Sequence, residues 1–304
     1  MKDIAVILIN YNSSKYTLEC VDTVLKKTNP KLSIEIIVVD NNSEIEDYKN
    51  LKDSFPQKKN VALHRSVINT GFGGGNMYGA QFANAQYILF LNNDAMLIND
   101  ALDICKGYMD SNPKVGVCTA QNYDENNNFI PSFDHNKGLR RLLLGRGFLE
   151  KSNPNRYPKR KQEYTAPLKV DWVNGAFLFF KTDVFSKISG FDTNIFLYWE
   201  EMDICHRLKQ IGFESVLLPK AKILHFQGVS IAVSKEINKE GYRSFLYSTR
   251  KNFGVVKYNL IRGYLTFVLL SKPKKWYLVP TVISSAILKN SLKQKQKIRY
   301  INEN

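Results

Sequence analysis

The sequence predicts an α/β fold, a mostly parallel, doubly wound sheet flanked by helices. Over the first 120 residues, five β-rich runs alternate with helical patterns, and the links between them are short. Polar residues follow several of these runs, at the sheet edge where ligands of doubly wound folds bind. The chain has 304 residues, 44% hydrophobic and 12% aromatic, so it can bury a core.

The strands are continuous apolar runs, as is typical of strands buried on both faces of a parallel sheet. In chain order they are predicted over residues 4–9, 34–39, 61–65, 87–91 and 115–120. Helices are predicted between them, over about residues 14–25, 44–54, 76–85 and 100–110. Ser13 or Ser14 can cap the first helix, and a glycine turn over 71–75 precedes the third.

Beyond residue 121 the organisation changes. Residues 122–167 are rich in Asn, Pro, Lys and Arg without periodicity, which predicts a long mobile loop. Order returns over 170–181, followed by a helix near 201–211 and a strand at 215–218. We therefore expect one domain over residues 1–234 and a basic helical tail over 235–304.

The net charge of +15 is concentrated in two segments. Residues 137–161 carry nine basic residues and one acidic residue, and residues 235–304 carry 15 and three. The rest of the chain is close to neutral, which argues against a positively charged coat for nucleic acid. We therefore expect no nucleic-acid partner.

The four cysteines lie far apart without a C-x-x-C pair, so neither structural zinc nor a disulfide framework is expected. The N-terminus does not read as a signal peptide. No apolar stretch reaches the roughly 18–20 residues of a spanning helix. The sequence therefore predicts a cytoplasmic protein in a reducing compartment.

Asp94 is the first candidate for chemistry. It follows the fourth strand after Asn92 and Asn93, and a carboxylate with oxygen neighbours at a strand end favours Mg²⁺ or Mn²⁺ bridging a diphosphate. Asn-Asn-Asp is also ordinary turn chemistry, so both interpretations stay open. His225 follows a strand-like run and matters only if the fold brings it beside Asp94, since a lone histidine is more often structural.

The glycine-rich segment 69–76 provides flexible backbone before a helix N-terminus, where it could approach a ligand closely. Neither G-x-G-x-x-G nor G-x-x-x-x-G-K-[ST] is present, so the dinucleotide and P-loop interpretations fail. A loop that needs glycine only for its own conformation explains the segment equally well.

Three carboxylates, Glu200, Glu201 and Asp203, lie within four residues beside aromatic side chains. Their repulsion and partial desolvation should raise the pKa of at least one, which suits a general base for a sugar hydroxyl. Asp203 has Arg207 four residues later, the spacing of a helical ion pair, so Glu201 is the freer candidate. The alternative is an acidic helix N-terminus favoured by the helix dipole.

Together these residues resemble the inverting glycosyltransferases of family 2, which have the GT-A fold with its Rossmann-like nucleotide-sugar-binding sheet. The subgroup that the chain looks most like contains rhamnosyltransferases and related enzymes of polysaccharide assembly. The likeness runs in order through residues 4–12, 38–43, 69–76, 91–94, 174–176, 196–203 and 219–230. Two positions differ from the family pattern: Asn92-Asn93-Asp94 replaces Asp-x-Asp, and Glu201 stands where aspartate is common.

The resemblance implies a role for each matching residue. A dTDP-rhamnose or UDP-hexose donor would be held by Asn10, Tyr11, Asn12, Asp40, Asn41, Asn69, Gly71, Phe72, Asn76, Asn92 and Asn93. Mn²⁺ or Mg²⁺ would be bound by Asp94 and His225, and Glu201 would be the catalytic base. The acceptor or the transferred sugar would contact Trp172, Asn174, Gly175, Trp199 and Glu200.

The tail contains short apolar stretches at 264–270 and 276–288, separated by a lysine-rich segment. Aromatic residues beside lysines suit an interfacial helix, so we expect docking on the anionic inner face of the cell membrane. A lipid-linked or glycan acceptor of bacterial cell-surface polysaccharide synthesis, such as capsule, would explain this docking. The alternative is packing on the catalytic body or on a second copy in a homodimer.

Two other functions remain as alternatives at this stage. A non-catalytic module for nucleic acid or another anionic polymer should carry interleaved aromatic and basic residues on its body, and this body is nearly neutral. A sugar nucleotidyltransferase usually has a basic, glycine-rich phosphate loop near its N-terminus, where residues 10–14 read Asn-Tyr-Asn-Ser-Ser.

Overall fold

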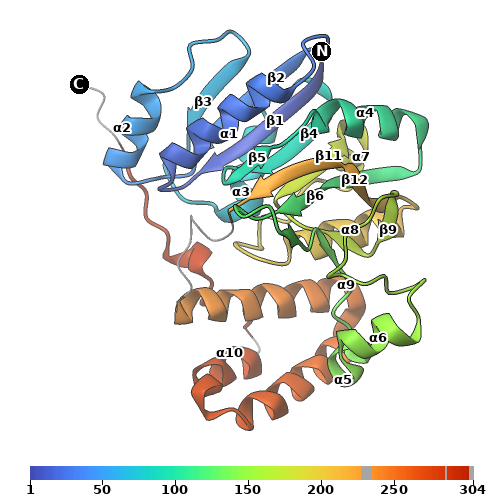
Figure 1. Cartoon of the computed structure of the whole chain (residues 1–304). Coiled ribbons are helices and arrows are strands. Elements are labelled where there is room, and N and C mark those ends of the chain that lie inside the picture. The colour runs from blue at the N-terminus through green and yellow to red at the C-terminus, as the bar shows by residue number, and fades with distance from the viewer. Residues whose placement is uncertain (227–233, 285, 301–304) are drawn as a thin grey trace.

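The structure is a computed structural model that describes residues 1–226, 234–284 and 286–300. Figure 1 shows a twisted sheet with helices on both faces and, below it, a smaller group of helices. The C-terminal part of the chain forms most of this lower group, which α5 and α6 join from the middle of the sequence. The predicted α/β fold with a C-terminal basic helical extension is confirmed.

Ten of the described strands form one sheet, whose main path runs β3-β2-β1-β4-β11-β6-β12-β5. The first four strands on this path pair in parallel, as do β6 and β12, whereas β11 is antiparallel to both of its neighbours. The strands are β1 (Lys2–Asn10), β2 (Ile34–Asp40), β3 (Val61–Arg65), β4 (Ala85–Asn92), β5 (Ala95–Leu97), β6 (Val115–Tyr123), β7 (Phe129–Ile130), β8 (Phe133–Asp134), β9 (Leu168–Val170), β10 (Trp172–Val173), β11 (Phe177–Lys181) and β12 (Glu214–His225).

The helices connect these strands and build the extension. They are α1 (Ser14–Lys27), α2 (Ile45–Asp53), α3 (Gly71–Ala80), α4 (Ala101–Ser111), α5 (Leu139–Leu144), α6 (Arg146–Ser152), α7 (Thr182–Lys187), α8 (Glu200–Gln210), α9 (Lys235–Leu270), α10 (Val279–Ile283) and the 3₁₀ turns η1 (Pro273–Leu278) and η2 (Leu292–Lys295). The five strands and the helices predicted between them are all present, within a few residues except at α3.

The glycine-rich segment is a correction to the prediction. It was expected as a turn before a helix over 76–85, and it is instead the first half of α3. A Cβ on Gly79 would lie 2.7 Å from Cγ2 of Ile7 in β1, so glycine lets this helix approach the sheet closely. The local preference of glycine for turns is overruled by this packing.

Two further predictions need correction. Residues 122–167, predicted as one long loop, contain the strands β7 and β8 and the helices α5 and α6, although the expected mobility stays a prediction. The strand predicted at 215–218 continues as β12 to His225, across a register shift between Leu218 and Lys222 that accommodates Pro219. The 228–230 part of the sequence likeness lies outside the described residues.

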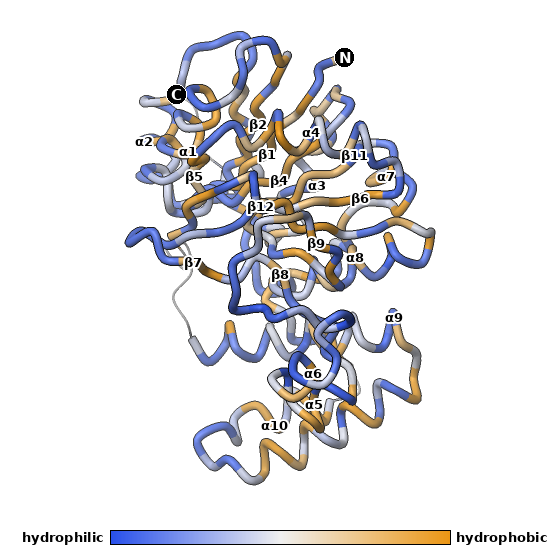
Figure 2. The backbone as a smooth tube through the Cα atoms, turned by 45° about the vertical axis from the view of Figure 1, so that its right-hand side comes forward, coloured by the Kyte–Doolittle hydropathy of each residue, from blue (hydrophilic) through white to orange (hydrophobic). Residues whose placement is uncertain are grey.

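The sheet is covered with apolar side chains on both faces. Successive residues of β1 point alternately toward α1 and α4 on one face and toward α3, α7 and α8 on the other. Figure 2 shows these hydrophobic strands in the body and a separate set of hydrophobic residues along the C-terminal helices. A core on both faces holds the strand ends, and the polar residues that follow them, in fixed positions.

The long element α9 consists of two helices. Gly254 has φ 81° and ψ 171°, which breaks the helix, and the chain turns there (Figure 1). By length and composition alone, α9 is the one described helix long and apolar enough to cross a membrane, contrary to the expectation that no such stretch exists. The part after the break, residues 255–270, extends about 24 Å at 1.5 Å per residue, short of the ~30 Å hydrocarbon core.

Candidate active site

A cavity of about 670 Å³ opens at the carboxyl ends of β1 and β4, between the sheet, the start of α8 and the extension. Fourteen of the predicted site residues line it: Tyr11, Asn41, Asn69, Gly71, Phe72, Asn76, Asn92, Asn93, Asp94, Asn174, Gly175, Glu200, Glu201 and His225. Asp94, Glu201 and His225 come from three distant parts of the chain. The fold therefore brings the candidate metal ligands and the candidate base to one cavity.

The position of His225 follows from strand pairing. β5 starts directly after Asp94 and runs antiparallel to the end of β12, with Ala95 opposite His225. The amide of Phe226 donates to the carbonyl of Asp94 at 3.1 Å. As a result, Nε2 of His225 lies 3.3 Å from Oδ1 of Asp94. The histidine that the sequence could not place is thus beside the candidate metal carboxylate.

This pair of side chains fits a divalent cation. Nδ1 of His225 is buried and has no hydrogen-bond partner among the described residues, and buried polar atoms rarely stay unpaired unless they serve an ion, a water or a function. A carboxylate and an imidazole are both ligands of Mn²⁺, whereas Mg²⁺ prefers oxygen. In the described parts of the chain, no three or more His, Cys, Asp or Glu side chains form a metal cluster. Asp94 and His225 are thus two neighbouring side chains of this cavity that could hold such a cation.

Asn93 holds the neighbouring helix in register. Its Nδ2 donates to Oγ of Ser13 at 2.6 Å and to Oγ1 of Thr17 at 2.8 Å, both at the N-terminal end of α1. The strand end that carries Asp94 is therefore tied to the loop that carries Tyr11. These contacts keep the two sides of the cavity at a fixed separation.

The wall formed by α3 is organised by side-chain amides. Asn41 donates through Nδ2 to Oδ1 of Asn69 and to the carbonyl of Gly71, both at 3.1 Å, and its Oδ1 accepts from the amide of Thr70 at 3.0 Å. Gly71 has φ 75°, and a Cβ there would overlap the carbonyl oxygen of Phe196. Glycine at this position thus allows α3 to pack directly against the loop that leads into α8.

The acidic end of α8 follows an unusual backbone. Tyr198 and Trp199 both have positive φ, 69° and 72°, which is uncommon for residues other than glycine and often found at functional sites. This conformation turns the chain so that Glu200 and Glu201 begin the helix at the cavity wall. The positive end of the helix dipole also favours carboxylates at this position.

The two glutamates differ in their surroundings. Burial, and then the charge of Glu201, raise the pKa of Glu200 well above its usual range. Burial also raises the pKa of Glu201, while hydrogen bonds from backbone amides, including that of Gly175, oppose the rise. Glu200 is only 3% exposed, and its Oε1 has no hydrogen-bond partner among the described residues. Burial therefore raises the pKa of both carboxyl groups, and their mutual repulsion adds to the rise at Glu200.

Gly175 and Glu201 are matched to one another. A Cβ on Gly175 would overlap Oε1 of Glu201. The absence of a side chain at residue 175 therefore makes room for the carboxylate. Asn174 stabilises the same turn, because its Oδ1 accepts from the amide of Ala176 at 2.9 Å.

Five predicted residues have other partners in this structure and do not line the cavity. Nδ2 of Asn10 donates to Oδ1 of Asp40 at 3.0 Å, and Asp40 pairs with Arg65 at 3.1 Å. Asn12 accepts from the amide of Glu44 at 2.8 Å, at the start of α2. These contacts shape the loops around Tyr11 and Asn41, and direct contact with a nucleotide stays a prediction for these three residues.

Trp172 and Trp199 are the remaining two predicted site residues that do not line the cavity. Their rings lie 6.3 Å apart, and Trp199 packs on Phe245 of α9 at 4.8 Å, at the joint between the body and the extension. Nζ of Lys137 lies 4.8 Å from the centre of the Trp199 ring. Stacking on a sugar stays a prediction for both tryptophans.

The extension also contributes to the cavity, which the sequence did not predict. Ile237 at the start of α9 and Leu292 and Gln296 near the C-terminus line its wall. No local pattern marks them, because they reach the cavity only through the path of the chain: Nδ2 of Asn42 donates to the carbonyl of Lys297 at 2.9 Å. The tail, expected as a membrane or protein contact, thus also forms part of the site.

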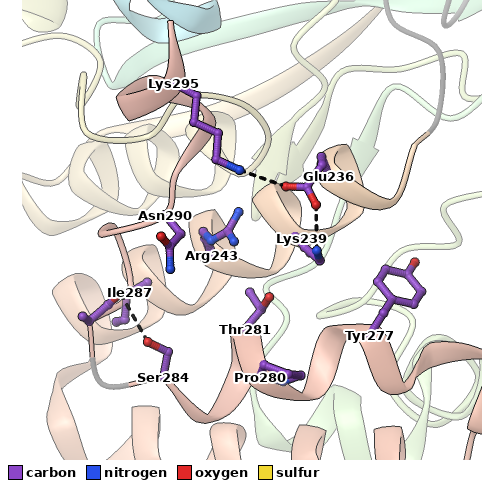
Figure 3. Close-up of a pocket in the computed structure, with 11 residues that line it drawn as sticks. Glu236, Lys239, Arg243, Tyr277, Pro280, Thr281, Ser284, Ile287, Asn290 and Lys295 are labelled. Atoms are coloured by element: carbon purple, nitrogen blue, oxygen red, sulfur yellow. Dashed lines mark hydrogen bonds and ion pairs between the residues drawn. The ribbon is translucent and has the colours of Figure 1, made fainter.

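A second, smaller cavity of about 330 Å³ lies within the extension (Figure 3). Glu236 is held there by Lys239 at 2.6 Å and by Lys295 at 3.2 Å. None of the predicted site residues lines this cavity. Each of the two lysines is already paired with Glu236, and Arg243 pairs with Glu240 at 3.2 Å, so this cavity is a weaker candidate for a substrate site.

The fold is that of the GT-A glycosyltransferases. A solved structure of GalNAc-T7 with UDP, GalNAc and Mn²⁺ superposes with a TM-score of 0.62 and 16% identity over 82% of this chain and 48% of that one. The mannosyltransferase PcManGT from Pyrobaculum calidifontis, in complex with GDP-Man and Mn²⁺, superposes with a TM-score of 0.55 and 15% identity. That superposition covers 96% of this chain and 78% of PcManGT. At such identities the likeness establishes the fold.

The family follows from the sequence comparison. The model of glycosyl transferase family 2 matches residues 5–189, and the chain belongs to this family. Among curated proteins, the rhamnosyltransferase WbbL of Escherichia coli K12 is 26% identical over 167 residues, which cover 51% of this chain and 61% of WbbL. The match thus spans less than two thirds of that relative. This chain is a family 2 glycosyltransferase with rhamnosyltransferases among its relatives.

Proposed function

We propose that this glycosyltransferase moves one sugar from dTDP-rhamnose or a UDP-hexose to a hydroxyl of a glycan or lipid-linked acceptor, with inversion at the anomeric carbon. The observation that carries this proposal is the meeting of Asp94, His225 and Glu201 in one cavity whose other walls are rich in amides. The rhamnosyltransferase among the relatives supports the first donor, and the UDP in the GalNAc-T7 structure supports the second.

The diphosphate of the donor would lie beside Asp94 and His225. These two residues would hold Mn²⁺ or Mg²⁺, as the Mn²⁺ in structures of GT-A neighbours supports. A bound divalent cation would offset the negative charge that develops on the leaving nucleoside diphosphate. The nucleoside would extend from there toward Tyr11 and the amides of Asn41 and Asn69, which are already fixed by hydrogen bonds.

Glu201 would act as the base. The acceptor hydroxyl gives its proton to the Glu201 carboxylate while its oxygen forms the new bond to the anomeric carbon. The bond from that carbon to the diphosphate oxygen breaks on the opposite face, and its electron pair leaves with the nucleoside diphosphate. A single displacement inverts the anomeric configuration and needs no covalent intermediate on the enzyme. The raised pKa of Glu201 makes its carboxylate a better proton acceptor.

The acceptor would belong to cell-surface polysaccharide synthesis, such as capsule in a bacterium, at the inner face of the cell membrane. The basic extension beside the cavity supports an acceptor that is anchored in or near an anionic surface. Family membership favours this function over the two alternatives, an anionic-polymer-binding module and a sugar nucleotidyltransferase.

Two measurements on the same preparation test the proposal. The first is the melting temperature with Mn²⁺ and each of dTDP-rhamnose, UDP-glucose, UDP-galactose, UDP-N-acetylglucosamine and single-stranded DNA. One nucleotide-sugar should stabilise the protein more than the others, and the DNA should not stabilise it. The second is the anomeric configuration of the product, read by NMR. Stabilisation by DNA alone, or a product with retained configuration, would overturn the proposal.

A further inference from the structure

We propose that the helices α5 and α6 and the second half of α9 form one surface that docks on anionic lipid headgroups. The lipid-docking surface is defined by the exposed apolar residues Leu143, Phe148, Val256, Leu260, Phe267, Leu270 and Trp276 and the lysines and arginines around them. The inference deepens the proposed membrane association, on which it rests, by adding a segment whose last residue, Ser152, precedes the start of the extension at Lys235 by 83 residues.

Residues 255–270 have two apolar faces. Tyr258, Ile261, Leu265 and Leu269 are buried and pack into the core of the extension. Val256, Leu260, Phe267 and Leu270 are between 54% and 75% exposed. At about 100° per residue, these four fall within roughly 80° of one another, on the side opposite the buried residues. One face therefore holds the extension together, and the other has no partner among the described residues.

The helix α5 packs beside this part of α9, and α6 follows α5 directly in the chain. The hydroxyl of Tyr264 donates to the carbonyl of Leu142 at 2.6 Å, and Leu139 and Leu142 pack against the core of the extension. Figures 1 and 2 both show α5, α6, α9 and α10 gathered at the end of the molecule away from the sheet. Leu143 in α5 and Phe148 in α6 are 65% and 57% exposed, and in the proposed surface they add to the apolar area of the extension. Contiguous exposed apolar areas are rare on soluble monomers and mark interaction sites.

The positive charges around these apolar residues favour an anionic partner. The two strongly basic segments of the sequence, 137–161 and 235–304, come together at the lipid-docking surface. Arg140, Lys257, Lys272, Lys274 and Lys275 are exposed and have no ion-pair partner in the described parts of the chain. The acidic residues that the structure describes in these two segments, in contrast, are paired: Glu150 with Arg146, Glu236 with Lys239, and Glu240 with Arg243.

An anionic bilayer fits this combination better than a second copy of the chain. Two copies would bring like charges together, whereas anionic headgroups attract them. Apolar side chains flanked by lysines, with an exposed tryptophan, suit burial at the headgroup boundary. The 255–270 helix is too short to cross the hydrocarbon core, so it would lie along the surface.

The test is co-sedimentation of the full chain with vesicles, without donor or acceptor. Vesicles of 30% phosphatidylglycerol in phosphatidylcholine are compared with pure phosphatidylcholine at low and high salt. The wild type should bind the anionic vesicles, and high salt should weaken the binding. The pair Leu143→Ser and Phe148→Ser should reduce the partition coefficient at least tenfold, as should Phe267→Ser. Ile211→Ser, a matched exposed apolar residue on the body, should bind like the wild type.

Several results would overturn the inference. If the Leu143/Phe148 variant bound anionic vesicles as tightly as the wild type, α5 and α6 would not belong to the lipid-docking surface. Equal sedimentation of the wild type with neutral and anionic vesicles would show that the basic residues do not direct docking to anionic headgroups. A dimer in analytical ultracentrifugation that these substitutions dissociate would make the surface a protein interface. The melting temperature of each variant shows whether it is folded. Nucleotide binding by each variant tests the proposed catalytic function separately from docking on the vesicles.

Discussion

The carboxylate of Glu201 occupies space that a side chain on residue 175 would fill. We predict that Gly175→Ala pushes this carboxylate aside and lowers kcat by about 100-fold, the cost of roughly 1 Å of misplacement. Donor binding, measured by calorimetry, should stay close to that of the wild type. Gly107→Ala in α4 is the matched control, because a Cβ there meets no atom within 4 Å. Normal turnover by Gly175→Ala would contradict the fit described above.

The role of Glu201 itself is tested by Glu201→Gln, which keeps the shape and removes the basicity. We expect donor binding to persist and the transfer rate to fall by about 10²–10⁴-fold, the usual contribution of a general base. Glu214→Gln is the control, since Glu214 pairs with Lys169 in a partly exposed contact outside the cavity lining. If Glu201→Gln turned over at the rate of Glu214→Gln, another group would be the base.

The same residue sets an expectation for pH. Burial raises the pKa of Glu201, and a base works only when it is deprotonated. Activity should therefore fall as the pH drops through this raised pKa, at a pH above the ordinary glutamate value of about 4.3. A profile of kcat against pH locates this acid limb, which should be absent from the residual activity of Glu201→Gln. An acid limb shared by both proteins would assign it to a different group.

At the scale of elements, α8 and α9 are joined through one buried carboxylate. Asp203 is fully buried and pairs with Arg207 at 2.6 Å, as the sequence spacing predicted, and with Lys251 of α9 at 2.9 Å. We predict that Asp203→Ala lowers the free energy of unfolding by about 2–3 kcal/mol, less than for a fully buried pair because both cations are partly exposed. Urea denaturation measures this change. Asp183→Ala, which breaks an exposed pair with Lys187, should cost less than about 1 kcal/mol.

Elements were predictable where local pattern and packing agree. The strands 4–9 and 34–39 are apolar throughout because both sheet faces are covered, and the structure has them within two residues. Prediction failed where a distant contact decides the outcome. Gly75 and Gly79 lie within α3, where the lack of a side chain lets the helix approach Ile9 and Ile7 of β1 closely. The strand β12 continues past Pro219 because a register shift accommodates the proline. The helix α5 packs through Leu139 and Leu142 against the core of the extension, which is distant in the sequence.

The same distinction applies to the site. Asp94 and Glu201 stand in short motifs whose chemistry is local, so both could be proposed as site residues from the sequence, and both line the cavity. Their meeting with His225 depends on the pairing of β5 with β12, which the sequence did not show. Trp172 and Trp199 carry the right chemistry for sugar stacking but pack between the body and α9. Ile237, Leu292 and Gln296 carry no motif and were missed for that reason.

For the whole molecule, the C-terminal segment connects the extension to the loops of the body that follow β2 and β3. The amide of Arg299 donates to the carbonyl of Val67 at 2.8 Å, and its guanidinium pairs with Glu44 at 2.6 Å. We predict that deleting residues 291–300 weakens nucleotide binding about tenfold, since hydrogen bonds of roughly 1 kcal/mol each are lost along the cavity wall. Calorimetry with UDP and dTDP measures the effect, and circular dichroism checks that the sheet is intact. Unchanged affinity would exclude this segment from the site.

The central claim is that Asp94 lies where a divalent cation and the donor diphosphate meet, in the cavity that also holds Glu201. Its most direct test is the melting temperature of the wild type and Asp94→Ala with UDP or dTDP, each with and without Mn²⁺. The account predicts that Mn²⁺ increases the stabilisation of the wild type by nucleotide and that Asp94→Ala loses this increase. An equal Mn²⁺-dependent shift in both proteins would contradict it.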